Sequence, residues 1–358
     1  MIQFTLRRLL LLIPVLFGIL FVTLVISRAI PGDPCVAMMG EKATQAQCAA
    51  FRVRFGLNDN VIVQFGRYVV QLAQGNFGDS IQYHRPVLEY ITERLPMTFE
   101  LTLGAMLFST TFGILLGIIS ALKRNTIIDT LTMIGANIGI SMPVFWLGLM
   151  LAYVFALLLK GTPLYIPPSG RLTPGVSLVP LATVWHLQSW TGLPQLALNF
   201  ISNSAILNSI LTGKFNILWD AIRHLILPSL AVGTIPLATI ARMTRSSLLD
   251  VLGQDYIRTA RAKGLVASLV ITRHALRNAL IPIVTVIGLE TSALLSGAVL
   301  TETVFTLPGM GTALVSAILA RDYPVVQGFT IIIAFIFVMA NLIVDLSYAY
   351  LDPRIRLE

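Results

Sequence analysis

Charged side chains are scarce in this sequence. Only 12% of its 358 residues are Asp, Glu, Lys or Arg, whereas a soluble domain averages about 25%. Hydrophobic residues make up 56%, and the mean hydropathy is +0.81. These values exclude an ordinary soluble domain and indicate an integral membrane protein.

Recognisable catalytic and metal-binding patterns are also lacking. No G-x-x-x-x-G-K-[ST] loop is present, because Gly213-Lys214 is followed by Phe215. The four histidines and two cysteines are not at metal-ligand spacing. We therefore expect no enzyme activity, no metal and no cofactor in this chain.

The net charge of +8 needs an explanation in so apolar a sequence. Membrane proteins collect Lys and Arg on their cytoplasmic side, so the charge does not indicate a nucleic-acid partner. Short segments carry Arg7 and Arg8, Lys123 and Arg124, a block from Arg242 to Arg277, and Arg354 and Arg356. The rule then places both termini and this block in the cytoplasm.

Six apolar segments predict six transmembrane helices. The first follows Arg7 and Arg8 and lacks a small-residue cleavage site, so it is expected to be retained. The third is too long for one straight crossing, and Pro143 in Ser141-Met142-Pro143 is expected to kink it. The segments are 9–27, 99–122, a span within 127–159, 225–241 with its helix continuing to 250, 280–301 and 326–346.

The connecting segments divide the chain further. We expect a first helix over 1–30, a folded extracytoplasmic segment over 31–97, and a core transmembrane domain over 98–358. In the second of these, a short helix should begin at Pro86 and close at Pro96. The core should contain an extracytoplasmic loop over 160–222, rich in Pro, Ser and Asn, and a cytoplasmic loop over 250–279.

Close helix packing is indicated by two small-residue patterns, Gly113-x-x-x-Gly117 and Gly135-x-x-x-Gly139. In spans this rich in glycine, many such matches arise by chance.

The basic segment "DYIRTARAKGL" from Asp255 to Leu265 is the main functional candidate. Helical spacing places Tyr256, Thr259, Ala260 and Lys263 on one flank, and Gly264 is expected to end the helix. An amphipathic helix resting on anionic lipid is one interpretation; a docking helix for a soluble partner protein is the other. Small side chains favour docking, because they let a partner approach the backbone. The candidate residues are Asp255, Tyr256, Arg258, Thr259, Ala260, Arg261, Lys263 and Gly264.

A translocation path is predicted along the third, fourth and fifth spans, near Pro143, Pro236 and Glu290. Pro228 and Pro236 make the fourth span the easiest to deform. Glu290, expected roughly mid-span, either lines the path or is satisfied by a neighbouring helix. An intramembrane carboxyl also keeps an ion-coupled secondary transporter open as an alternative.

Cys35 and Cys48 are the two cysteines of the chain, and both fall in the segment predicted to lie outside the cytoplasm. Disulfides persist in such compartments, and the spacing allows a bridge. The alternative is two unpaired cysteines buried as small apolar residues.

A family resemblance is carried by "DYIRTARAKGL" and "RHALRNALIP". They resemble the coupling loop of inner-membrane permeases of binding-protein-dependent ABC importers, whose pattern is EAA-x3-G followed by I-x-L-P. Arg258-Thr259-Ala260 stands at EAA and Gly264 at the Gly, but the glutamate is missing. His274 to Arg277 replaces I-x-L-P. These departures match the dipeptide/oligopeptide/nickel branch, as do "IPGDP", "LTETVF", "PGMG", "RDYPVVQG" and "LDPRIR".

The resemblance implies an all-α, polytopic type I importer permease in the inner membrane of a bacterium. It implies a second homologous permease, two ATP-binding subunits that hold ATP and Mg, an extracytoplasmic solute-binding protein and membrane lipid as partners. The implied cargo is di- or oligopeptide, with nickel, glutathione or sugar oligomers as alternatives. ATP would close the ATPase dimer, move the coupling helices and turn the permease pair outward.

Overall fold

The computed structural model describes residues 2–29, 35–36, 43–54, 56, 58–296 and 298–351. Apart from an isolated bridge between Asp79 and Pro86, this part of the chain consists of helices and loops, which confirms the all-α prediction. It contains five helices long and apolar enough to span a membrane, or six if a bent pair counts as one span. "IPGDP" (30–34) and the "DPRIR" portion of the last motif lie outside the described residues.

Two long helices, α5 (Val87–Leu122) and α11 (Phe215–Leu252), form the centre of the bundle. Glycines bring them into close contact. A methyl group on Gly113 would lie 2.9 Å from the Leu237 carbonyl oxygen, and one on Gly117 would lie 2.7 Å from that of Ala241. The Gly113-x-x-x-Gly117 prediction is therefore confirmed.

The second glycine pattern is only half realised. Gly139 packs against Thr234 of α11, whereas nothing approaches within 4 Å of a methyl group placed on Gly135.

Pro96 lies inside α5, so the prediction that it closes a short helix is wrong. A proline inside a helix costs about 3 kcal/mol. Burial on both sides offsets this cost: Tyr90 and Ile91 pack before the proline, and Met97 and Leu101 pack after it. One continuous helix therefore replaces the predicted short helix and second span.

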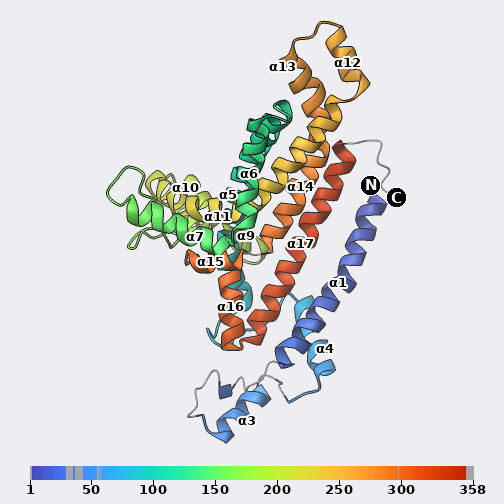
Figure 1. Ribbon diagram of the computed structural model, residues 1–358. Helices are drawn as coiled ribbons and strands as arrows, with labels where there is room; N and C mark the ends of the chain where they lie inside the picture. The colour runs from blue at the N-terminus through green and yellow to red at the C-terminus, as the bar shows by residue number, and fades with distance from the viewer. Residues whose placement is uncertain are drawn as a thin grey trace.

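The predicted third span bends next to Pro143 as expected, but the bend is sharp enough to divide it into two helices. Helix α6 (Ile127–Ser141) is followed after a bend of 101° by α7 (Val144–Ala152) and the π-helical segment η1 (Tyr153–Leu158). Pro143 occupies the N-cap position of α7, where its missing N–H breaks no helical hydrogen bond. As a result α7 runs sideways from the bundle, towards the left of Figure 1.

Short helices fill the predicted loop 160–222: α8 (Leu181–Val184), α9 (Leu193–Asn203) and α10 (Ala205–Leu211). Helix α11 begins at Phe215, ten residues before the predicted start of the fourth span at 225. The extra turns form because Ile217, Ala221, His224 and Leu225 bury one helical stripe.

The remaining long helices lie on one side of the central pair. Helix α17 (Tyr323–Leu351) packs between α14 (Arg277–Leu295) and α1 (Ile2–Ala29). An ion pair of 2.9 Å between Arg8 and Asp345 joins α1 to α17 at one end. Figure 1 shows α1 at the edge of the molecule, and its apolar face there is left exposed.

The predicted fifth span is displaced along the chain. It begins at Ala267, through α13 (Ala267–Leu269) and the π-helical η2 (Val270–Leu276), and ends with α14 at Leu295 rather than at 301. Residues after it form α15 (Val299–Val304) and α16 (Met310–Ala320). The π-helical η2 directly precedes α14. It extends the span into the predicted loop 250–279.

Buried carboxylates fasten the segments at the end of the bundle opposite α12. Glu302 accepts hydrogen bonds from Thr98 Oγ1 (2.6 Å) and the Thr312 N–H (3.0 Å). The same threonine oxygen accepts from the Met310 N–H, so α5, α15 and α16 meet at this carboxylate. Burial raises the pKa of the Glu302 carboxyl above its usual range, and these hydrogen bonds oppose the rise.

Two further buried carboxylates also join separate segments through hydrogen bonds. Glu100 accepts from Arg171 (2.9 Å), Ser204 Oγ (2.7 Å) and the Ile206 N–H (2.8 Å), which ties the 160–214 segment to α5. Asp322 accepts from the N–H groups of Ile81 (3.2 Å) and Gln82 (3.0 Å), which holds the turn before α5 against α17.

A disulfide bond joins Cys35 to Cys48, the latter in α3 (Gln45–Arg54). Both cysteines pack against Phe51 and Ile81, so the bridge holds α3 on the turn that Asp322 fastens. The alternative of two unpaired cysteines does not describe this structure.

Thiol counting tests the bridge directly. Unreduced, denatured protein is expected to show no free thiol, and reduced protein two. Cys48→Ser is expected to cost roughly 3 kcal/mol in the stability of this segment, because a bridge restricts the unfolded chain. Limited proteolysis of residues 43–54 measures that loss. Two free thiols before reduction would contradict the bridge and would weaken the argument that this segment lies outside the cytoplasm.

Candidate functional site

The predicted coupling segment forms α12 (Asp255–Ala262). It lies at one extreme end of the molecule together with α13, beyond the ends of α5 and α17 (Figure 1). It connects α11 to the span that begins at Ala267. A protein that contacts this end of the bundle therefore meets α12.

Local sequence explains why a short helix forms here. Asp255 stands in the first turn and Arg261 in the last, which suits the partial charges at the two ends of a helix. Gly264 follows with a φ of +77°, a backbone conformation that side chains disfavour. The prediction that Gly264 ends the helix is confirmed.

The inner face of α12 is formed by Ile257 and Ala260, whose exposed fractions are 0% and 7%. They pack with Leu248 of α11 and with Val270 and Ala275 of η2. The predicted flank of Tyr256, Thr259, Ala260 and Lys263 is therefore wrong for Ala260. Its small side chain fits this chain's own core, because the apolar Ile257 fixes which face turns inward.

The outer face of α12 carries the rest of the candidate residues. Arg258 is 75% and Asp255 95% exposed, and these two form a weak surface ion pair of 3.3 Å. The exposed set is Asp255, Tyr256, Arg258, Thr259, Arg261, Lys263 and Gly264. The outer face thus presents three cations, one carboxylate and a partly exposed tyrosine ring.

The same face is connected to the fifth span. The Tyr256 hydroxyl accepts a hydrogen bond of 2.8 Å from Asn278 Nδ2 of α14. Together with the buried inner face, this contact fixes α12 to both helices that flank it. Helix α12 is therefore held against α11 and α14 rather than carried on a loose loop.

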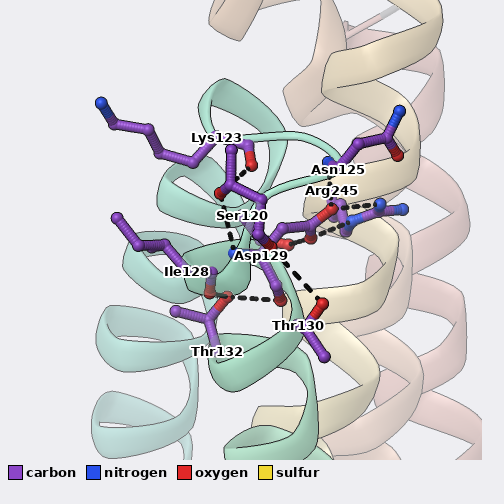
Figure 2. A network of polar contacts seen from close by, with 9 residues as sticks. Ser120, Lys123, Asn125, Ile128, Asp129, Thr130, Thr132 and Arg245 are labelled. Atoms are coloured by element: carbon purple, nitrogen blue, oxygen red, sulfur yellow. Dashed lines mark hydrogen bonds and ion pairs between the residues drawn. The ribbon is translucent and has the colours of Figure 1, made fainter.

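A partly buried ion pair, drawn in Figure 2, joins α11 to α6 near this end of the bundle. Arg245 of α11 donates two hydrogen bonds to Asp129 of α6, both 2.8 Å long. Asp129 also accepts from Ser120 Oγ of α5 and from the Asn125 N–H at 3.0 Å. We call these four residues the Asp129 clamp.

The clamp joins three helices at one carboxylate. Asp129 is 6% exposed, and a two-pronged arginine–carboxylate pair is among the most strongly oriented polar contacts. Arg245 lies two turns of α11 before its end at Leu252. Movement of α12 should therefore reach α5 and α6 through this clamp.

The predicted path residues do not converge on a described cavity. Pro143 is exposed at the bend before α7, and Pro236 is buried inside α11. Glu290 is half-buried and lies five residues from the outer end of α14, not mid-span, because the span starts at Ala267. In the described part of the chain it has no hydrogen bond or ion pair.

Sequence reasoning missed the Asp129 clamp and the buried acids Glu100, Glu302 and Asp322. For Glu302 a signal existed, because "TETVF" precedes "PGMG" and the glycines leave room for a carboxylate beside Gly309. For Asp129 the only hint was a lone acid among basic residues.

The chain is similar to known membrane transport proteins along most of its length. Residues 113–357 match the model of the family "binding-protein-dependent transport system inner membrane component", and residues 1–102 match that of its N-terminal region. The chain is 46% identical to the dipeptide transport system permease protein of Alkalihalophilus pseudofirmus, over 99% of this chain and 100% of that one.

Two other relatives extend this comparison. Identity is 44% to the di/tripeptide transport system permease protein of Pseudomonas aeruginosa, covering 99% of each chain. It is 38% to the oligopeptide transport system permease protein of Bacillus subtilis, covering 99% of this chain and 100% of that one.

Proposed function

The chain belongs to the family of inner membrane components of binding-protein-dependent transport systems, and we propose that it is a permease subunit of an ATP-driven importer of di- and oligopeptides. It is a membrane transport component and not an enzyme. The observation that carries the proposal is α12, a braced helix with an exposed basic face at one end of the bundle.

The energy that displaces α12 would have to come from another subunit. The sequence contains no phosphate-binding loop, so ATP and Mg would be held by two partner ATPases. Closure of their dimer would displace α12. Since Ile257 and Ala260 seat α12 on α11 and η2, the displacement would move these helices together.

The Asp129 clamp would carry the motion further. Arg245 moves with α11, and its two hydrogen bonds pull Asp129 and hence α6. Helix α6 ends at the bend before α7. This chain and a second homologous permease would then open the path between them towards a solute-binding protein outside.

The route itself is proposed to involve Pro143, Pro236 and Glu290. The 101° bend at Pro143 and the prolines of α11 are the places where these helices deform most easily. A half-buried carboxyl without a protein partner in the described residues is suited to a passing peptide ammonium group.

The peptide assignment is supported by the names of the similar permeases from three bacteria. Nickel, glutathione and sugar oligomers remain the competing cargoes, and an ion-coupled secondary transporter is the competing mechanism. No feature of the described residues favours that mechanism over the importer.

Uptake into reconstituted vesicles tests the proposal. With the ATPases and a solute-binding protein present, labelled di- and tripeptides are expected to accumulate only when ATP is supplied on the ATPase side. Nickel, glutathione and sugar oligomers should neither accumulate nor compete. Accumulation that follows a proton gradient without ATPases would refute the importer, and nickel-specific accumulation would refute the peptide cargo.

A further inference from the structure

A polar cavity of about 510 Å³ lies between the ends of α1 and α17, the helix α4 (Val61–Ala73) and the turn at residues 76–84. Ligand pockets commonly have volumes of about 300–1,000 Å³. It is separate from α12 and from the Asp129 clamp, at the opposite end of the bundle. Its polar lining includes Arg28, Arg67, Tyr68, Asp79, Tyr323 and Gln327.

Arg28 supplies a cation with spare hydrogen-bonding capacity. It donates one hydrogen bond to Gln64 Oε1, and its guanidinium lies 5.1 Å from the centre of the Tyr323 ring. A guanidinium has five N–H donors. No second protein acceptor bonds to it within the described residues, so donors remain for an oxyanion.

Two other groups in the lining are unsatisfied by protein. Tyr68 is only 8% exposed, and its hydroxyl has no hydrogen-bond partner among the residues described here. Buried polar groups almost always have a partner. Asp79 is exposed to solvent and forms no side-chain hydrogen bond or ion pair with a described residue, so its carboxylate is available to a ligand cation. A ligand with an oxyanion and an ammonium group would satisfy Arg28, Tyr68 and Asp79.

The position of the cavity indicates where such a ligand comes from. Arg28 stands at the end of the 25-residue span Thr5–Ala29, which places it where the hydrocarbon meets the headgroups. Helix α4 is strongly amphipathic. It buries Tyr68 and exposes Ile62, Val63 and Val70, as expected of a helix lying in the interface.

An apolar surface adjoins the polar lining. Leu24 and Arg28 line the cavity, and the neighbouring face of α1 exposes Val22, Val25 and Ile26. An amphiphile could place its headgroup in the cavity and its chains along this face. A free peptide has no acyl chains that could cover this apolar face of α1.

We propose that this cavity binds the headgroup of a phospholipid from the outer leaflet, with the phosphate on Arg28 and Tyr68 and an ammonium group beside Asp79. Arg67 contributes less, because it is already paired with Asp59 at 2.8 Å. The bound lipid would fill the space between α1 and α17 at the level where these spans leave the membrane.

Photo-crosslinking in nanodiscs tests the proposal. The transporter, purified with its partner subunits, is placed in bilayers doped with phosphatidylethanolamine that carries a photoreactive group near its phosphate. Adducts mapped by mass spectrometry are expected in α4 and at the start of α17. Arg28→Ala should reduce them about tenfold, as expected for loss of a charge-assisted hydrogen bond. Arg28→Lys should retain part of the labelling.

Controls separate the site from general lipid contact. Lys214→Ala removes an exposed cation elsewhere on the same side and should leave the labelling unchanged. Phosphatidylglycerol should label less than phosphatidylethanolamine, and Asp79→Asn should abolish that difference. Labelling spread along α1 and insensitive to Arg28→Ala would overturn the lipid site. Competition by free dipeptide would also overturn it and assign the cavity to peptide.

Discussion

Asp129→Ala is expected to abolish most ATP-driven uptake and to destabilise the protein by roughly 2–4 kcal/mol. The change leaves the Arg245 guanidinium without its carboxylate, and breaking a buried ion pair is costly because one charge remains uncompensated. Arg245 is 30% exposed, so solvent screening reduces the cost below that of a fully buried pair. Thermal unfolding in detergent and vesicle uptake measure the two effects.

A double variant separates stability from coupling. Asp129→Leu combined with Arg245→Met removes both charges and replaces them with apolar side chains, a change that is often neutral for stability. We expect this variant to unfold near the parent temperature but to couple poorly, because the oriented link from α11 to α6 is gone.

An exposed ion pair provides the matched control. Asp59 and Arg67 also lie 2.8 Å apart, but both side chains are at least 40% exposed. Asp59→Ala should therefore change stability by less than about 1 kcal/mol. If Asp129→Ala behaves like Asp59→Ala in both assays, the clamp has neither role.

Thr259→Trp is expected to uncouple ATP hydrolysis from uptake while leaving the unfolding temperature nearly unchanged. Thr259 lies on the outer face of α12, and its hydroxyl only bonds back to the Asp255 carbonyl at 3.1 Å. A tryptophan there would obstruct a docked ATPase without entering this chain's core. Hydrolysis and uptake are measured in the same vesicles.

Two further variants are compared with Thr259→Trp. Ala260→Trp points into the core beside Ile257 and Leu248, so it should lower both stability and uptake, since overpacking typically costs about 1–3 kcal/mol. Thr130→Trp is the control, because Thr130 is also exposed on a helix and also bonds back four residues. Normal uptake by Thr259→Trp would refute docking on the outer face of α12.

Sequence patterns predicted the elements whose signals are local. Apolar length located the spans but not their ends, and Gly264 marked the end of α12. Prolines were read correctly at Pro143, where the chain turns, and incorrectly at Pro96. Pro96 differs from Pro143 because tertiary packing buries the helix on both sides of it. No local sequence pattern indicates that burial.

For the candidate site too, local sequence signals were predicted and contacts made by tertiary packing were not. Composition predicted that the segment around α12 docks a partner, but the face of α12 that turns inward is set by the packing of Ile257 against Leu248 and Val270. The Asp129 clamp joins residues 116 positions apart in sequence. Such pairs come from the packing of α5, α6 and α11, which a single sequence does not specify.

The length of α5 has a mechanical consequence. Its 36 residues extend about 54 Å at 1.5 Å per residue, while the hydrocarbon core is about 30 Å thick. Ser120, near one end, belongs to the Asp129 clamp, while Thr98 and Glu100, about 33 Å away along the helix, hold α16 and the 160–214 segment. The part of α5 between these contacts contains no proline and therefore acts as a stiff lever. A tilt of about 5° at the Ser120 end would swing the segments held by Thr98 and Glu100 sideways by about 3 Å.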